Sequence, residues 1–376
     1  MKVSHAVTLV GLCTGAIGIA ATQGCSSSST TAPPAEAGAG TSITAPAKPS
    51  GPATTVTAEH NYALSKLYLG DTDRAGASNQ LAWKTFGYNI DNKITTKDST
   101  DVCGLASGAS KSTQTDGNGG IDNSFGENIL PIILTTAGQD AAKKINDSIT
   151  QGKFTIMIDV TGLDDANAKQ TATGLTGFLN AGGTFDPTPG GMKQPTFTTV
   201  DDWPVRPELL TSPTDAKSSK IKFPDAYVVN GTFVNGSPGN LTLNLAIGGV
   251  ALDLTITNAV ITFDHTGAGK GANGTIAGVI NTEDLISKLK TVAGRISTSL
   301  CQGSAFESIA QQIRQASDIK ADGTNTSGST CDGISIGLGF DASEIALPKT
   351  VGALAPPSAD PCNMTDAGVQ DTGGGG

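Results

Sequence analysis

The sequence predicts a mainly β fold, in which an antiparallel, β-sandwich-like core carries about three packed helices in an α+β arrangement. Two observations favour this fold class. Several segments alternate apolar and polar residues with a period of two, and the few helical patterns do not alternate regularly with them. The chain also contains 48 Gly among 376 residues, with only 5% aromatic and 15% charged residues. This composition is typical of many turns and short strands.

The strands are predicted from alternation and from turn residues. Every second residue is Leu, Ile or Val in 241–247 and again in 250–256, and Gly248-Gly249 lies between the two runs. Because Gly can adopt the positive φ angles of a tight turn, this pattern predicts a hairpin. A second hairpin is predicted around Asn230-Gly231, within 227–234. Further strands are predicted at 154–160 and 275–280.

Three segments have a helical period. The first, 128–149, begins near Pro131, which the first turn of a helix tolerates because its missing N–H has no partner there. The second, 282–293, is predicted to end at Gly294. The third, 304–318, begins with Ser304 and Glu307, which have the spacing of a capping box.

The N-terminus has the pattern of an export signal. Lys2 and His5 precede an apolar stretch from Ala6 to Ala21, which is too short to span a bilayer. The order Thr22-Gln23-Gly24-Cys25 resembles the lipobox of bacterial lipoproteins, in which the Cys is acylated and becomes the new N-terminus. This resemblance implies lipidation of Cys25, with secretion or release into the periplasm as the alternative.

The domain organisation follows from composition. Residues 1–24 are the predicted signal peptide, and 25–57, rich in Ser, Thr, Ala and Pro, are a predicted flexible tether. Residues 58–362 are predicted to form a single β-rich globular domain, and 363–376, which end in four glycines, a disordered tail. The formal net charge of −10 makes nucleic acid and anionic lipid head groups unfavourable partners.

Four cysteines remain after Cys13 in the signal and Cys25 are set aside. Cys103, Cys301, Cys331 and Cys362 predict two disulfides in an exported protein, with three possible connectivities. Their wide spacing contains no CxxC pair and disfavours a structural zinc site. A Cys301–Cys331 pair is favoured, and free, buried thiols are the alternative.

The stretch from Asp116 to Glu127 is the best candidate for a metal site. Asp116, Asn118, Asp122, Ser124 and Glu127 place oxygens at offsets that resemble an EF-hand loop, which predicts Ca²⁺ as a cofactor. Gly120 departs from that pattern, because it stands one place before the required Gly and occupies a ligand position. The alternative is a surface turn that leads into a helix, with Ser124 and Glu127 as a capping box.

No catalytic residue is predicted. The run Gly333–Gly337 matches GxSxG, but an extended pattern follows it and no His follows His265. Only His60 and His265 lie beyond the signal, which disfavours His-rich zinc sites and a histidine-based triad. Carboxylates such as Asp71 and those at 73, 164, 165, 201 and 202 are either turn residues or members of a glycosidase pair.

Five segments carry a resemblance to a protein group. They are YLGDTDR (68–74), GGIDNSFG (119–126), WPVRPELL (203–210), FESIAQQIRQASDI (306–319) and CDGISIGLGF (331–340). In them the chain resembles uncharacterised Gly-rich envelope lipoproteins of myxobacteria. The resemblance implies a tethered, exported protein and supplies no catalytic residue. Ser26 after the acylated Cys implies sorting to the outer membrane, as in Gram-negative lipoproteins.

Three functional hypotheses follow from these observations. The preferred one is a membrane-anchored, non-catalytic binding module outside the cytoplasm, with glycan as the expected ligand and a lipid anchor as its contact with the membrane. The second is a carboxylate-dependent hydrolase of polysaccharide or cell wall. The third is a carrier of apolar ligands that uses the Leu-rich segment 241–263 as an apolar surface.

Overall fold

A computed structural model describes residues 41–186, 188, 193–237, 239–247, 250–267, 269–354 and 360–363. The predicted signal, Cys25, the first part of the predicted tether and residues 364–376 lie outside the described residues. Chain contacts separate Met1–Gly38 from Ala39–Gly376, and every described residue belongs to the second unit. No described helix is long and apolar enough to cross a bilayer.

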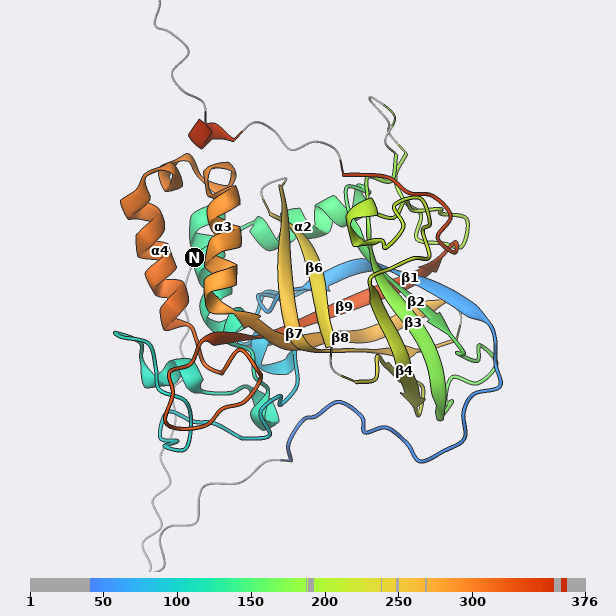
Figure 1. The fold of residues 1–376 in the computed structure, drawn as a ribbon, viewed down its shortest axis with the longest axis horizontal. Coiled ribbons are helices and arrows are strands. Elements are labelled where there is room, and N and C mark those ends of the chain that lie inside the picture. The colour runs from blue at the N-terminus through green and yellow to red at the C-terminus, as the bar shows by residue number, and fades with distance from the viewer. Residues whose placement is uncertain are drawn as a thin grey trace, which may run out of the picture. The chain divides into compact units, whose positions relative to one another are not determined.

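Nine strands and four α-helices form within the described residues (Figure 1). The strands are β1 (Glu59–Tyr68), β2 (Thr155–Thr161), β3 (Ala172–Gly182), β4 (Ile221–Val229), β5 (Thr232–Val234), β6 (Gly239–Ile247), β7 (Val250–His265), β8 (Lys270–Asn281) and β9 (Gly333–Ile345). The helices are α1 (Leu130–Ala137), α2 (Ala141–Thr150), α3 (Thr282–Ile296) and α4 (Gly303–Gln315).

The strands form one antiparallel sheet that closes on itself. Their order is β5-β4-β3-β2-β1-β9-β8-β7-β6, and β5 also pairs with β7. Eight strands therefore make a barrel, and β6 extends from the first half of β7. The antiparallel, mainly β prediction is confirmed, but a closed barrel replaces two facing sheets.

Closure of the barrel depends on a tight turn and on one side chain. Asn230 and Gly231 have φ angles of 50° and 88° and join β4 to β5 in the predicted hairpin. This turn sends the short β5 against β7, where Phe233 faces Phe263. Asn235 then extends the pairing beyond β5, because its amide donates to Ala259 O and its carbonyl accepts from Ile261 N–H.

The core lies between the inward rows of the strands and the helices. Leu252, Leu254 and Ile256 lie on one row of β7, and a bulge between Thr257 and Val260 shifts the alternation. Ile261 and Phe263 therefore continue the buried row. Helix α2 packs on β1 and β6, and α3 packs on β7 (Figure 1).

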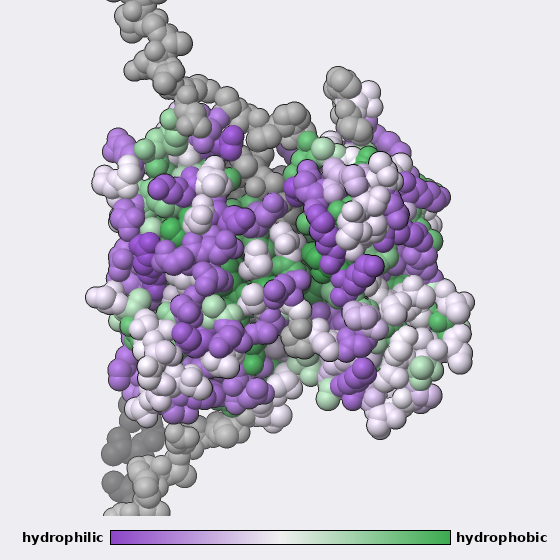
Figure 2. Space-filling model, in the orientation of Figure 1, coloured by the Kyte–Doolittle hydropathy of each residue, from purple (hydrophilic) through white to green (hydrophobic). Residues whose placement is uncertain are grey.

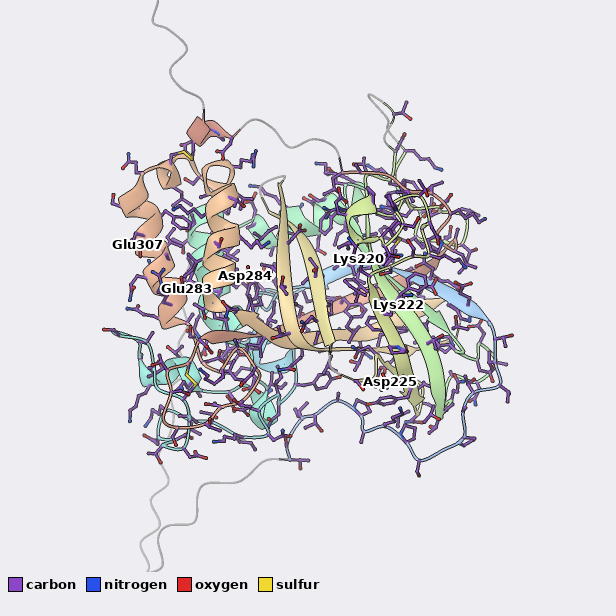
Figure 3. All side chains as sticks on the ribbon, viewed as in Figure 1. Lys220, Lys222, Asp225, Glu283, Asp284 and Glu307 are labelled. Carbon is purple, nitrogen blue, oxygen red and sulfur yellow. A yellow bond between two sulfur atoms is a disulfide. The ribbon has the colours of Figure 1, made fainter. Side chains whose placement is uncertain are left out.

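The helical predictions are confirmed in part. The single helix predicted at 128–149 is wrong, because Gly138, at φ 102°, separates α1 from α2. Helix α3 follows the second prediction and continues to Ile296. Helix α4 starts at Gly303, so Ser304 lies inside it, and Glu307 pairs with Arg314 instead of forming a capping box. Arg314 also bonds Glu283 at 2.7 Å, which ties α4 to α3; Figure 3 labels both glutamates.

Residues 41–57, which the sequence assigns to the tether, lie against the domain. Ile43 N–H donates to Gly119 O, and Thr54 N–H donates to Thr173 O. Between them, Tyr227 Oη donates to Pro46 O at 2.7 Å. The ordered body therefore begins before the predicted boundary at residue 58.

Two disulfides form, as predicted, but the favoured pair is wrong. Cys103 is bonded to Cys331, and Cys301 to Cys362. The 103–104 segment lies beside 329–331, because Gly104 N–H donates to Ser329 O and Cys331 N–H donates to Gly104 O. This backbone pairing places Cys103, and not Cys301, next to Cys331.

Candidate functional site

The predicted calcium ligands bond to several different parts of the chain. Asp122 accepts from Ile90 N–H at 2.6 Å, and Asp116 accepts from Thr95 N–H at 2.5 Å. The Ser124 hydroxyl donates to Ala316 O at 2.6 Å, so the predicted capping box does not use it. Asn118 is exposed. Within the described part of the chain, no three His, Cys, Asp or Glu side chains form a group spaced to hold a metal ion. Calcium binding by this loop stays a prediction.

The acids of this region form a buried electrostatic cluster. Burial raises the pKa of Asp116 to about 8 and that of Asp318 to about 7. Burial also raises the pKa of Asp122, and the negative charges of Asp91 and Asp116 add to the effect. These carboxyls accept hydrogen bonds from backbone and side-chain groups of other segments, and Asp116 and Asp318 titrate near neutral pH.

The GxSxG match is structural, as the sequence indicates. Ser335 lies in the middle of β9 and is fully buried. Its backbone N–H donates to Asp318 Oδ1 at 2.9 Å, and its hydroxyl lies 2.5 Å from Asp318 Oδ2. The same hydroxyl accepts from Ser124 N–H. Ser335 therefore links β9 to the two neighbouring segments.

A pocket of about 570 Å³ lies between the loop after β1 and the start of α1. We call it the Glu127 pocket. Its polar lining comes from Asp71 and Gln80 in the loop, Glu127 in the π-helical turn Phe125–Ile129, and Thr135 and Gln139 in and after α1. Leu81 and Trp83 supply apolar surface, and Leu81 is 58% exposed. The volume lies within the range of small-molecule sites.

The floor of the Glu127 pocket is built by two glycines that close on Trp83. A Cβ at Gly70, where φ is 113°, would lie 3.0 Å from Trp83 Cβ. A Cβ at Gly126 would lie 2.6 Å from the same atom. Only residues without a side chain let both segments approach the indole. Asn123 fixes the arrangement, because its amide donates to the carbonyls of Trp83, Phe86 and Gly337.

The two carboxyls of the Glu127 pocket have perturbed acidity. Burial raises the pKa of Glu127 to about 7, although Lys84 and the Asn128 amide oppose the shift. Burial also raises the pKa of Asp71. Near neutral pH the Glu127 carboxyl can therefore act as a hydrogen-bond donor as well as an acceptor. The sequence does not indicate this role, because Glu127 is notable there only as part of the loop pattern and Asp71 only as one of several acids.

The leucines of the segment 241–263 whose burial the structure describes do not form an exposed apolar surface. Leu241, Leu243 and Leu254 are each at most 2% exposed and belong to the core. A separate apolar hollow lies between α1, α3 and α4, but its volume is about 40 Å³. That volume is far below the several hundred Å³ of ligand pockets. Figure 2 shows one face of the molecule, on which hydrophilic residues predominate and hydrophobic residues are visible between them near the centre.

Most aromatic residues of the N-terminal half of the chain belong to the core. Tyr62, Phe86 and Trp203 are fully buried, and Trp203 donates its indole N–H to Gly183 O at 2.8 Å. Trp83, by contrast, lines the Glu127 pocket. The sequence offers one signal for this position: Trp83 follows the Gly- and Asp-rich loop that forms the rim.

The histidines are the other group that sequence reasoning undervalued. His60 on β1 and His265 on β7 are buried at the same end of the barrel. Each lies on the inward row of its strand, two residues from Tyr62 or Phe263. In the sequence, each His occupies a position that the alternation of its strand assigns to the buried face. That position brings the two side chains together only when β1 and β7 belong to one closed sheet.

Comparison with known proteins gives no relative from which a role could be transferred: no protein-family model, curated protein or solved structure matches this chain.

Proposed function

We propose that the protein is an envelope lipoprotein, anchored through Cys25, that binds a neutral glycan segment in the Glu127 pocket. The observation that carries the proposal is the combination in one pocket of two half-buried carboxyls, two amide side chains and an apolar wall. The signal-like N-terminus supports the location, and the pocket supports the ligand class.

The chemistry of the lining fits a polyhydroxylated ligand. Hydroxyl groups donate and accept hydrogen bonds, and Gln80 and Gln139 can do both. Glu127, whose pKa lies at about 7, can do the same near neutral pH. The C–H face of a sugar ring can pack against Leu81, whose side chain is 58% exposed at the pocket. A strongly charged ligand fits less well, because Asp71 and Glu127 are the only ionisable lining groups among the described residues.

Calorimetric titration with soluble chitin, cellulose, xylan and β-1,3-glucan oligosaccharides tests the proposal. We expect Glu127→Ala and Gln139→Ala each to weaken binding of the preferred sugar by roughly fivefold, the equivalent of one hydrogen bond of about 1 kcal/mol. Glu307→Ala on α4 is the matched control, because this glutamate lies outside the pocket and is labelled in Figure 3. Equal affinities for the Glu127 and Glu307 variants, or no binding across the panel, would contradict the proposal.

A hydrolase is the second candidate, and the acidity of Glu127 favours it. A carboxyl that keeps its proton near neutral pH can act as a general acid, and Asp71 supplies a second carboxyl in the same pocket. Reducing-end release from the same oligosaccharides separates the two functions. A hydrolase would show turnover that falls as pH rises through about 7 and is abolished by Glu127→Gln. A binding module would show no turnover.

A further inference from the structure

Two histidines from distant parts of the chain meet at one end of the barrel. His60 and His265 are 4% and 1% exposed, and their ring centroids lie 6.0 Å apart. Neither residue belongs to the Glu127 pocket. Their burial needs an explanation, because imidazole nitrogens lose their water partners on entering the interior.

One nitrogen of each ring has a partner and the other does not. His60 Nδ1 lies 2.9 Å from Glu344 Oε1, and His265 Nδ1 lies 3.0 Å from Tyr62 Oη. The two Nε2 atoms are buried and have no hydrogen-bond partner among the described residues. Glu344 accepts only from a protonated Nδ1, which leaves the Nε2 lone pair of a neutral His60 free.

A carboxylate faces both free nitrogens. Asp165 Oδ1 lies 3.4 Å from His265 Nε2 and 3.9 Å from His60 Nε2. Ligand atoms in a tetrahedral zinc site, with bonds of about 2.0–2.1 Å, lie about 3.3 Å apart. The His265–Asp165 pair already has that separation, and the His60–Asp165 pair is about 0.6 Å wider. In their described positions the three side chains therefore do not yet form a group that could hold a metal ion, and Asp165 has to move towards His60 to complete it. The Asp165 side chain is 57% exposed on the loop between β2 and β3, so it is free to close this difference.

We propose that His60 Nε2, His265 Nε2 and Asp165 Oδ1 form a binding site for zinc or a similar divalent transition-metal ion. Two imidazoles and one carboxylate are a ligand set that zinc uses with a fourth position left for water or substrate. That position lies near solvent, because the Asp165 side chain is 57% exposed.

The residues behind the histidines match the outer shell of a metal site. Metal-bound histidines usually donate their second N–H to a carboxylate or another oxygen, which fixes the orientation of the ring. Glu344 on β9 takes this position for His60, and Tyr62 on β1 takes it for His265. Both are held by barrel strands, so the two Nε2 atoms are oriented before an ion arrives.

Zinc binding by the full chain, purified without a polyhistidine tag, tests the proposal. We expect one zinc ion per chain after equilibrium dialysis at micromolar free zinc, measured by mass spectrometry of the metal. His60→Gln, His265→Gln and Asp165→Asn should each weaken binding at least tenfold. Asp164→Asn is the matched control, because Asp164 accepts from Ala166 N–H in the same loop and an Asn can replace that contact.

Cobalt provides a measurement that does not depend on the variants folding. Co²⁺ in the wild-type chain should give the intense visible absorption of a four-coordinate site, and added zinc should remove it. Absence of zinc and cobalt binding would overturn the proposal. Stoichiometric zinc binding that the three substitutions leave unchanged would overturn it as well, because the ion would then bind elsewhere.

Discussion

At the scale of single residues, Asn123 joins three segments of the chain through one side chain. Its side chain is buried, and its amide donates to Trp83 O, Phe86 O and Gly337 O, which share its two hydrogens, while its carbonyl accepts from Gly126 N–H and Gly337 N–H. Trp83 O also accepts from Phe86 N–H, but Asn123→Ala would remove the side-chain partner of the other backbone groups, at about 1–3 kcal/mol each when buried. We expect the free energy of unfolding, measured in urea, to fall by at least about 3 kcal/mol.

Asn118→Ala is the control for this prediction, since Asn118 is exposed in the same loop and its loss should change stability by less than about 0.5 kcal/mol. Similar effects of the two substitutions would show that the Asn123 network does not hold the segments together. If only Asn123→Ala lowers the stability, the same side chain both stabilises the fold and positions Trp83 at the Glu127 pocket.

The buried acids predict how stability depends on pH. Asp116 and Asp318 have pKa values of about 8 and 7 in the folded chain, above the value of about 3.9 expected when unfolded. The folded state therefore binds more protons between these limits, and the contribution of both groups to stability is present at pH 4 and is lost as pH rises towards 8. Between pH 5 and pH 8, the free energy of unfolding measured in urea should decrease less for Asp318→Asn than for the wild type. An identical drop would exclude Asp318 as a source of the dependence.

At the scale of elements, the two disulfides should differ in their contributions. Cys103–Cys331 is buried and closes a span of 228 residues, whereas Cys301 and Cys362 are exposed and close a span of 61. Removal of the first by Cys103→Ala and Cys331→Ala should cost about 2–5 kcal/mol, and removal of the second should cost less. Urea unfolding of the two double variants measures the difference. Mild reductant should open Cys301–Cys362 first, and the reverse order would contradict the prediction.

Local elements were predictable from sequence where the signal was local. Asn230-Gly231 predicted the β4–β5 turn, and the alternation at 241–256 predicted β6 and β7. The helix expected at 128–149 failed at Gly138, because apolar spacing continues across a residue whose backbone turns away at φ 102°. Ser304 and Glu307 have capping-box spacing, but a tertiary partner, Arg314, takes the glutamate.

At the scale of the whole molecule, the contacts that close the fold could not be predicted. The pairing of β5 with β7 joins segments whose alternation is equally compatible with two facing sheets. The same closure brings His60 to His265, and the pairing of 104 with 329–331 decides the partner of Cys103. The Glu127 pocket likewise joins a loop after β1 to the start of α1. In each case, residues far apart in sequence meet only through the tertiary structure.

The disulfide between Cys103 and Cys331 also determines how the folded chain responds to tension. When force is applied at residues 41 and 363, the tension follows the shortest covalent path, which crosses from Cys103 to Cys331. Residues 104–300 then form a side arm outside this path and do not carry the load. That arm contains β2–β8 and α1–α3. The load falls first on β1 and β9, which are hydrogen-bonded neighbours. Under oxidising conditions the rupture force of the domain would therefore report the β1–β9 pairing, and most of the barrel would unravel under load only after reduction.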